Sequence, residues 1–482
     1  MKNVAFHNLG CKVNSYELDV VQQNFVKKGY KIVPFDQIAD IYVVNTCTVT
    51  NIADRKSRQM LHQAKKRNPD ALVVALGCYV QTDAEKVGQD SCIDLAIGNN
   101  RKKDTVEIVE AYLKETGRNG RMSALFEPGA VSRTDIIDIN HTSEYEEMEL
   151  TKTAEHTRAY IKIQDGCNQF CTYCIIPFAR GRVRSRIPDD ICKEIEGLAA
   201  AGYREFVLTG IHISSYGVDF EDGELRDALE GKTQTGDQPQ EQPQSKVRYG
   251  KGTSLLLGLI LRIHEIKGVE RLRLGSLEPQ IVTEEFARTL GALHKICPHF
   301  HLSLQSGCDS TLGRMNRRYT TWEYRRGVDR LRTYFENPAI TTDVIVGFPG
   351  ETEEEFAKTQ AYLKEIEFFE MHIFPYSARK GTAAARMKEQ IDGETKKKRS
   401  HILLELEKEQ SLAYRRQFVG TQEEVLFEEQ KEIDGGTYIV GHTTRYVKVA
   451  KRIDSEDPTA LEGRIVRGNI VGMLGEDILL ME

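Results

Sequence analysis

The sequence lacks the long apolar runs and the basic leader that would place the protein in or across a membrane. In its 482 residues no stretch approaches the ~20 consecutive apolar residues of a membrane-spanning helix. The first residues, MKNVAFHNLGCKVN, do not have the basic start and apolar run of a secretory signal. We therefore expect a cytoplasmic protein without a membrane partner. In a reducing compartment its ten cysteines favour metal ligands, reactive thiols or core residues over disulfides.

An excess of positive charge is also missing. The formal net charge is −6, which argues against a surface coated throughout for nucleic acid. Phosphate contacts need only a local cluster of Lys and Arg, so the total does not decide whether one surface binds RNA. A hydrophobic content of 40% and a charged content of 29% are those of an ordinary globular protein. The length predicts roughly three domains.

Short apolar runs alternate with amphipathic stretches through residues 1–117. Val4–Leu9, Ile41–Asn45 and Leu72–Leu76 have the pattern of buried strands, and the segments between them have helical periodicity. This alternation predicts an α/β domain with a doubly wound parallel sheet. Residues 118–157 are acidic and irregular, which is typical of a connector.

A second series of strand and helix patterns occupies residues 158–418. Its six strand candidates predict a partial (β/α)6 barrel with catalytic groups at the carboxyl ends of the strands. They are Ala159–Ile163, Glu205–Thr209, Arg271–Leu274, Phe300–Leu304, Ile340–Val346 and Phe369–Phe374. Residues 231–252, rich in Gln, Gly, Thr and Pro, predict a flexible insertion. Five short strand patterns in residues 419–482 predict a small antiparallel β-barrel of the oligonucleotide-binding kind.

Three cysteines follow the first strand of the second series in a CxxxCxxC pattern: Cys167, Cys171 and Cys174. Three thiolates on one loop can hold a [4Fe–4S] cluster and leave its fourth iron open. An open iron can chelate the amine and carboxylate of S-adenosylmethionine (SAM), and electron transfer then yields a radical. The alternative is a structural zinc site. Zinc normally takes four ligands, and no fourth Cys or His lies nearby in the sequence, so the pattern favours the cluster.

Another three cysteines, Cys11, Cys47 and Cys78, each directly follow a predicted N-terminal strand. Because the carboxyl ends of parallel strands converge on one crevice, we expect these thiols to be neighbours. Gly10 and Gly77 allow the backbone to approach closely. One such cysteine alone is more typical of a small core residue, but three at equivalent positions indicate a second cluster. The remaining cysteines show no such pattern and are interpreted as packing residues: Cys92, Cys192, Cys297 and Cys308.

Together these features resemble the methylthiotransferase family of radical SAM proteins, over essentially the whole chain. The matching segments are LGCKVN at 9–14, NTCTVT at 45–50, GCY at 77–79, QDGC at 164–167, LTGIH at 208–212, LQSG at 304–307 and DVIVGFPGE at 343–351. The family has an N-terminal domain with an auxiliary cluster, a radical SAM domain and a C-terminal TRAM domain. The first two segments are most similar to the bacterial MtaB group, which modifies N6-threonylcarbamoyladenosine beside the anticodon. The insertion at 231–252 is longer than expected for this group but lies away from every cysteine motif.

The resemblance also implies roles for individual residues. The six patterned cysteines would hold two [4Fe–4S] clusters. Tyr173 would lie against the adenine of SAM, and Gly210 matches the strand end that meets its amino group. The remaining expected contacts to ribose, methionine or adenine are Ser276, Glu278, Gln305, Ser306, Val346 and Gly347.

The implied function is tRNA modification: insertion of a methylthio group at carbon 2 of N6-threonylcarbamoyladenosine at position 37. One SAM would methylate a sulfur at the cluster on Cys11, Cys47 and Cys78, and a second SAM would supply the radical. The implied partners are a tRNA anticodon stem-loop, an electron donor such as flavodoxin or ferredoxin, and a sulfur donor. Alternatives that stay open are the same chemistry on N6-isopentenyladenosine or a ribosomal-protein aspartate, and a non-enzymatic iron–sulfur RNA-binding protein.

Two groups of residues are candidates for RNA contact. Arg180, Arg182, Arg184 and Arg186 alternate like a strand after the cysteine loop and would face phosphates. The C-terminal candidates are Tyr438, His442, Arg445, Tyr446, Lys448, Lys451 and Arg452. A charged solvated edge and core aromatics are the competing interpretations.

Overall fold

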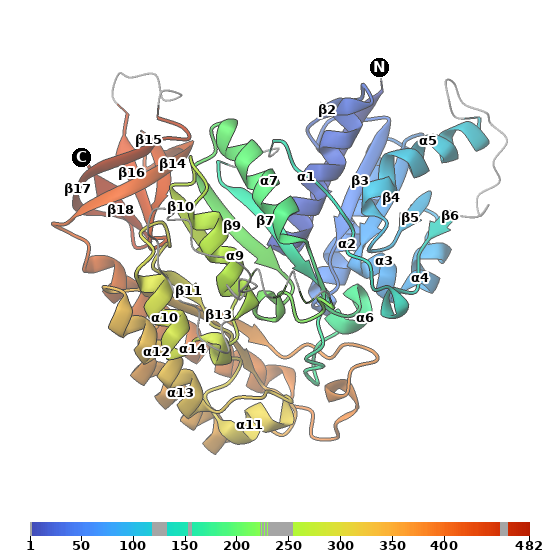
Figure 1. Ribbon diagram of the computed structural model, residues 1–482. Coiled ribbons are helices and arrows are strands. Elements are labelled where there is room, and N and C mark those ends of the chain that lie inside the picture. Colours follow the sequence, from blue (N-terminus) through green and yellow to red (C-terminus); the bar gives the residue numbers. More distant parts are fainter. Residues whose placement is uncertain are drawn as a thin grey trace.

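Three units lie side by side in the molecule: an N-terminal parallel sheet with its helices, a central curved sheet lined by helices, and a small C-terminal barrel (Figure 1). The computed structural model describes residues 2–117, 133–152, 157–221, 223, 226, 229, 254–453 and 461–482. The insertion predicted at 231–252 lies outside these ranges. Among the described residues, no helix is both long and apolar enough to cross a membrane.

The N-terminal unit is the doubly wound parallel sheet that the alternating patterns predict. Its strands lie in the order β2-β1-β3-β4-β5-β6, with bounds β1 (Asn3–Asn8), β2 (Lys31–Val33), β3 (Ile41–Thr46), β4 (Leu72–Gly77), β5 (Leu95–Ile97) and β6 (Arg133–Asp135). β3 and β4 are buried along their whole length, which is why they read as continuous apolar runs. One face is covered by α1 (Lys12–Lys27) and α5 (Thr105–Glu115), and the other by α2 (Asn51–Arg67), α3 (Cys78–Thr82) and α4 (Ala84–Gln89).

The segment expected to be a connector, residues 118–157, contributes to this sheet. Its β6 pairs with β5 in parallel. Farther along, the hydroxyl of Tyr16 donates to the carbonyl of Met148 (2.6 Å), and the backbone N–H of Leu150 donates to Glu194 (2.7 Å). The described part of the segment therefore packs between the first two units. A three-residue strand is too short to show a period, so sequence pattern could not reveal it.

The central unit is a partial barrel of six parallel strands, as predicted. They are β7 (Ala159–Asp165), β9 (Glu205–Gly210), β10 (Arg271–Leu274), β11 (His299–His301), β12 (Ala339–Val346) and β13 (Glu370–Pro375). The two-residue β8 (Arg184–Ser185) pairs antiparallel with β7. Single bridges such as Leu277 to Leu302 connect the β10 side to the β11 side.

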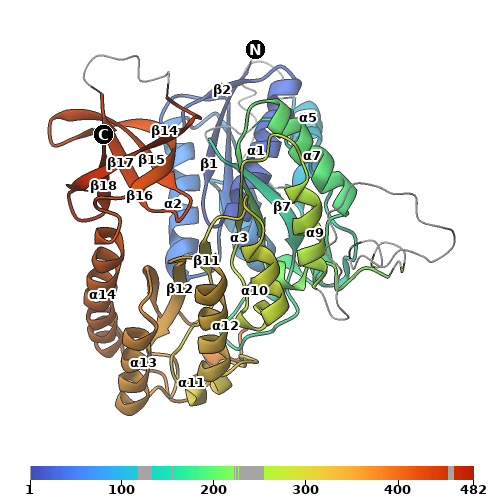
Figure 2. The same cartoon turned by 60° about the vertical axis from the view of Figure 1, so that its left-hand side comes forward.

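Helices cover the outer face of this curved sheet (Figure 2). Their bounds are α6 (Ile176–Arg180), α7 (Pro188–Ala200), α9 (Leu255–His264), α10 (Glu284–Gly291), α11 (Asp309–Arg314), α12 (Thr321–Tyr334), α13 (Glu353–Ile366) and α14 (Gly393–Arg416). Both α12 and α13 begin with a capping box, Thr320 with Glu323 and Thr352 with Glu355. Each box satisfies backbone N–H groups that the first turn leaves without partners.

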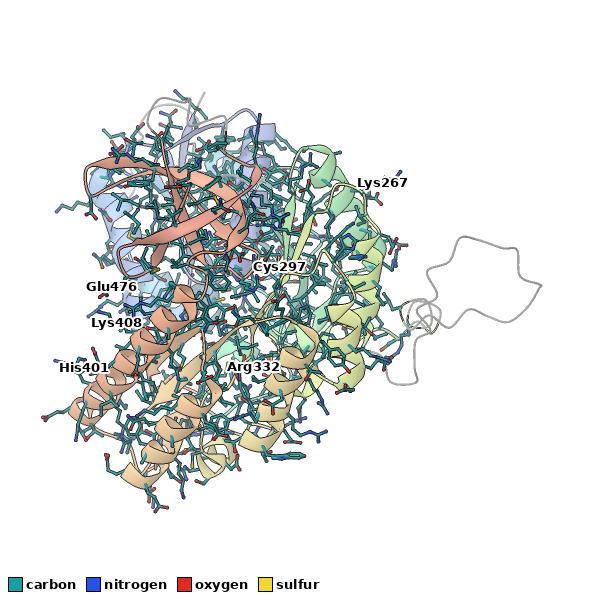
Figure 3. All side chains as sticks on the ribbon, turned by 90° about the vertical axis from the view of Figure 1, so that its left-hand side faces the viewer. Lys267, Cys297, Arg332, His401, Lys408 and Glu476 are labelled. Carbon is teal, nitrogen blue, oxygen red and sulfur yellow. The ribbon has the colours of Figure 1, made fainter. Side chains whose placement is uncertain are left out.

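The C-terminal unit is a closed five-stranded barrel in the order β14-β15-β16-β18-β17. The strands are β14 (Gln422–Ile433), β15 (Gly436–Thr443), β16 (Lys448–Arg452), β17 (Ile465–Leu474) and β18 (Ile478–Met481). Four neighbouring pairs are antiparallel, as expected, and β16 with β18 is parallel. Lys408 on α14 pairs with Glu476 in the β17–β18 turn at 2.7 Å (Figure 3). A cavity of about 340 Å³ follows the seam with the central unit and is lined in part by Cys297 and Thr444.

Candidate functional site

The structure brings Cys11, Cys47 and Cys78 together at one edge of the N-terminal sheet. Cys11 is the N-cap of α1, Cys47 directly follows β3, and Cys78 is the first residue of α3. Their strands β1, β3 and β4 are neighbours, so the carboxyl ends converge. Burial raises the pKa of the Cys47 thiol to about 12, and the charges of Cys78 and Cys11 add to the effect. Three thiols that interact in this way form one donor set.

Gly10 lets the backbone pass close to this donor set. Its φ is +107°, and a Cβ there would lie 3.0 Å from Cβ and 3.1 Å from Sγ of Cys47. Gly77, which precedes Cys78, has a φ of +94°. Neither conformation is comfortable for a residue with a side chain. The two glycines therefore define how near the three thiols can come.

Replacing Gly10 with alanine should destabilise the protein and displace Cys47. Gly29→Ala is a matched control, because Gly29 also has a positive φ (+86°) but no atom within 4 Å of a new Cβ. We expect about 1–3 kcal/mol of backbone strain in both variants. Only Gly10→Ala should in addition lower the iron bound after anaerobic reconstitution. Equal iron content in the two variants would show that contact at Gly10 does not matter for the thiols.

The N-terminal thiols also contact the loop that follows CxxxCxxC. Asn99 donates through Nδ2 to Sγ of Cys78 (3.5 Å) and to the carbonyl of Ala179 in α6 (2.7 Å). Arg180, the next residue, is fully buried, and its charge lowers the pKa of the Cys11 and Cys47 thiols against the larger raising effect of burial. The two cysteine triplets thus lie on either side of one interface.

The second triplet occupies the loop between β7 and α6. Burial raises the pKa of Cys174 to about 12 and that of Cys167 to about 11, and each is raised further by Cys171. The guanidinium of Arg317 donates to Sγ of Cys171 (3.2 Å) and also to Glu278 (2.6 Å). Arg317 therefore places a buried cation directly at this sulfur.

The donor chemistry of both triplets fits an iron–sulfur cluster better than a single ion. Zn–S bonds of about 2.3 Å in a tetrahedron would hold sulfurs about 3.8 Å apart. Neither triplet has its three Sγ atoms within 4.8 Å of one another, although all six residues are described. A cubane, with its irons at separate corners, takes thiolates from more widely spaced positions. Asn99 and Arg317 also supply the hydrogen bonds to sulfur that such clusters commonly receive.

The residues expected to contact SAM differ in the contacts that they already make within the protein. The ring of Tyr173 packs edge-on against Phe348 at 6.4 Å, and Ser276 is exposed at the end of β10. Glu278 is held by Arg317, with His212 at 3.5 Å. The remaining residues are ordered mainly through internal hydrogen bonds: Gly210, Gln305, Ser306, Val346 and Gly347.

Three of these residues are turned to internal partners. Ser306 is fully buried, and its hydroxyl lies 3.3 Å from that of Thr359. The backbone N–H of Gly347 donates to Glu351 (2.7 Å). Gln305 has a φ of +69° and pairs through its backbone with Asp343 and Ile345. For these residues, the internal hydrogen bonds at the strand ends explain the presence of the motif at least as directly as a contact to SAM would.

The arginines expected to face RNA phosphates are mostly buried, and that expectation was wrong. Arg180, Arg184 and Arg186 are 0%, 1% and 2% exposed. Arg180 bonds to Glu17 and Asp165, and Arg186 pairs with Glu194. Only Arg182 of the series is exposed, with its guanidinium 4.5 Å over the ring of Phe170. The acids that pair with them lie on other elements, Glu17 on α1, Asp165 on β7 and Glu194 on α7, and were not visible in the local alternation.

Other residues of the site carried no local signal. Asn99 and Arg317 lie far in sequence from the cysteines that they contact. Arg379, in the loop after β13, donates to Thr48 and Asp54 of the N-terminal unit (2.7 Å each). Such partners become apparent only when the units are assembled, since no spacing rule connects them to the cysteines.

Models of known families match two parts of the chain. Residues 3–98 match the uncharacterized protein family UPF0004, and residues 161–363 match the radical SAM superfamily. A solved structure, the radical S-adenosylmethionine methyltransferase TsrM from Kitasatospora setae with cobalamin and a [4Fe-4S] cluster, is similar with a TM-score of 0.50 and 16% identity. It covers 78% of this chain and 75% of its own, and supports the fold alone.

Several curated proteins are similar over nearly the full length. The threonylcarbamoyladenosine tRNA methylthiotransferase MtaB of Bacillus subtilis is 38% identical, over 98% of this chain and 94% of its own. The protein of the same name from Aquifex aeolicus is 36% identical, over 93% and 98%. A tRNA-2-methylthio-N(6)-dimethylallyladenosine synthase of Clostridium botulinum is 30% identical, over 97% and 95%.

Proposed function

Because the chain belongs to the radical SAM methylthiotransferase family, we propose that it inserts a methylthio group at carbon 2 of N6-threonylcarbamoyladenosine at position 37 of tRNA. One SAM would donate the methyl group and a second would be the radical source. The observation that carries the proposal is the presence of two three-cysteine sites, with Cys78 of one bonded through Asn99 to α6, the helix that directly follows the loop of the other. A radical source alone needs only one such site.

Cys167, Cys171 and Cys174 would hold the [4Fe–4S] cluster that the radical SAM family uses with SAM. When bound, this cluster supplies the electron that cleaves SAM to an adenosyl radical. The residues of the protein orient the bound groups and set the charge around them. Arg317 places a buried positive charge against Cys171, and Glu278 holds Arg317 in position. Tyr173 lies within the loop, between Cys171 and Cys174, and its ring would contact the adenine of SAM.

Cys11, Cys47 and Cys78 would hold a second [4Fe–4S] cluster, at which the sulfur to be transferred is methylated. Gly10 and Gly77 keep this edge of the sheet open, and Asn99 donates to the sulfur of Cys78. The substrate base would lie between the two triplets, so that hydrogen abstraction and sulfur delivery take place on the same carbon. An electron donor, such as a flavodoxin or ferredoxin, and a sulfur donor would complete the reaction in the cytoplasm.

N6-isopentenyladenosine is the second candidate nucleoside, because relatives named for dimethylallyladenosine are 30–31% identical. Two observations favour the threonylcarbamoyl substrate. Relatives named for it range from 31% to 38% identity, and the two at 36% and 38% cover almost the whole chain. The GCKVN segment, which carries Lys12 directly after Cys11, is also similar to that group.

The test is a competition between the two nucleosides. The reduced, reconstituted enzyme is given SAM and two anticodon stem-loops, one with N6-threonylcarbamoyladenosine and one with N6-isopentenyladenosine at position 37. Mass spectrometry of the digested nucleosides should detect a methylthio product mainly from the first. The Cys167/Cys171/Cys174→Ala variant serves as the control and should give none. A product from the isopentenyl loop alone would overturn the proposed substrate, and no product from either loop would overturn the proposed reaction.

A further inference from the structure

The interior of the central barrel is polar and charged. Along β10, Leu272 and Leu274 belong to the apolar core outside the sheet, so the alternate residues Arg271 and Arg273 point inward. On β11 the same alternation places Phe300 in the outer core and His299 and His301 inside. Both arginines pair with Glu205 of β9, at 3.6 Å and 3.0 Å. This interior lies between the three units and next to the N-terminal thiols.

The charges in this interior do not balance. Arg158, at the start of β7, pairs with Glu428 of the C-terminal barrel at 3.2 Å, and Glu205 serves both Arg271 and Arg273. Lys12, at the start of α1, lies close enough to Arg158, Arg273 and Glu205 to interact with their charges. Within the described residues Lys12 has no ion pair or hydrogen bond of its own side chain. Four cations therefore share two carboxylates.

His299 provides a second group without a partner. Its side chain is buried, with the residue 8% exposed, and its Nδ1 has no hydrogen-bond partner among the described residues. Burial, with the charges of Arg273 and Lys12, holds the pKa of His299 well below its usual value, so the ring is neutral at neutral pH. A neutral imidazole can donate one hydrogen bond. His301 differs, because its Nε2 faces the carboxylate of Asp343 at 3.4 Å.

Tyr446 of the C-terminal barrel closes this end of the interior. It has a φ of +65°, which is rare for a bulky residue. Its ring lies 4.8 Å from the guanidinium groups of both Arg158 and Arg273 and 5.3 Å from the ring of His299. The arginines are thereby held in place by an aromatic ring and by acids. Among the described residues of this cluster, the ammonium of Lys12, Nδ1 of His299 and Nε of Arg271 have no hydrogen-bond partner.

We propose that Lys12 and Nδ1 of His299 form the binding subsite for the carboxylate of the N6 substituent, and so determine which nucleoside is accepted. The inference rests on the proposed function. A threonylcarbamoyl group carries a carboxylate, whereas an isopentenyl group is apolar and would cover the ammonium of Lys12, which is exposed in this structure, without giving it a partner, which is costly. Lys12 directly follows Cys11, one of the three N-terminal thiols. A backbone phosphate would supply the same anion chemistry, but the base and its substituent must enter this interior while the phosphates follow the RNA surface.

The test compares enzyme variants on paired substrates. Lys12→Gln and Lys12→Arg are assayed on stem-loops that carry N6-threonylcarbamoyladenosine or its methyl amide, in which the carboxylate charge is removed. Lys27→Gln, the same change at the other end of α1, is the matched control. Iron content and the absorption spectrum establish that each variant is loaded equally. His299→Leu is a second variant that does not adjoin a cysteine.

With wild type, kcat/KM should be about ten- to a hundredfold higher for the carboxylate than for the amide, the range expected for a charged hydrogen bond. Lys12→Gln should abolish most of this preference, His299→Leu should reduce it, and Lys12→Arg should restore it. An equal loss on both substrates would identify a phosphate contact and overturn the inference, as would an unchanged preference. If wild type were inactive on both stem-loops, the proposed function itself would fail, which is a distinguishable result.

Discussion

Replacing Arg180 with methionine should destabilise the protein by about 3–5 kcal/mol, the cost of removing one partner from a buried ion network. Arg180 is fully buried and donates to Glu17 (2.8 and 2.9 Å), Asp165 (3.0 Å) and Asn14 (2.6 Å). Glu17 also pairs with Lys162 at 2.7 Å and with Lys102. Without the guanidinium, Glu17 would keep only lysine partners, and Asp165 would keep Lys162 at 2.8 Å and the more distant Arg184 at 3.7 Å. The measurement is the free energy of unfolding in urea under anaerobic conditions.

Arg182→Met is the control for this prediction, two residues farther along the chain. Arg182 is exposed and lies over Phe170, with no acid partner among the described residues, so its loss should cost about 0.5–1 kcal/mol. Because Arg180 connects α1 to the end of α6, its replacement should also separate the two triplets. Equal stability of the two variants would mean that this network does not hold the interface together.

Alanine at Cys11, Cys47 and Cys78 should abolish methylthio transfer while SAM cleavage continues. The two triplets are separate donor sets, and only Cys167, Cys171 and Cys174 lie on the loop of the radical SAM domain. Loss of the N-terminal set should therefore leave SAM cleavage in place. After anaerobic reconstitution we expect about eight irons per chain in wild type and about four in either triple variant. Formation of 5′-deoxyadenosine and of the methylthio nucleoside are measured on the same samples.

The Cys192→Ala protein is a suitable control, since Cys192 lies on α7 and packs against the apolar core of the central unit. It should retain about eight irons and both activities. About four irons in wild type and none in the Cys167/Cys171/Cys174→Ala variant would show that the N-terminal triplet does not bind a cluster. Methylthio transfer by the Cys11/Cys47/Cys78→Ala variant would contradict the proposed second site directly.

Much of the architecture followed from local patterns. β3 and β4 are buried on both faces and read as unbroken apolar runs, and the six barrel strands were each recognised within a few residues. The CxxxCxxC triplet is contained in eight consecutive residues, so its chemistry needs no tertiary information. The family assignment, confirmed by relatives that span the chain, rests on segments of the same local kind.

Patterns failed where a residue's environment comes from another unit. The alternating arginines after the cysteine loop were expected at a surface, but Glu17 of α1 and Glu194 of α7 surround Arg180 and Arg186 in the interior. Tyr446 was expected to meet RNA and instead packs between Arg158 and Arg273. Short strands such as β2, β5 and β6 have three residues each and show no period.

The residue sequence alone therefore determined the strands, the two cysteine triplets and the family, because periodicity and spacing are properties of contiguous chain. Only the folded molecule decided that Asn99 and Arg317 touch sulfurs, that Arg180 joins the two domains, and that Lys12 and His299 are left with unused donors. The burial and the net charge of a site depend on residues from distant segments, so they are determined only when the three units pack together.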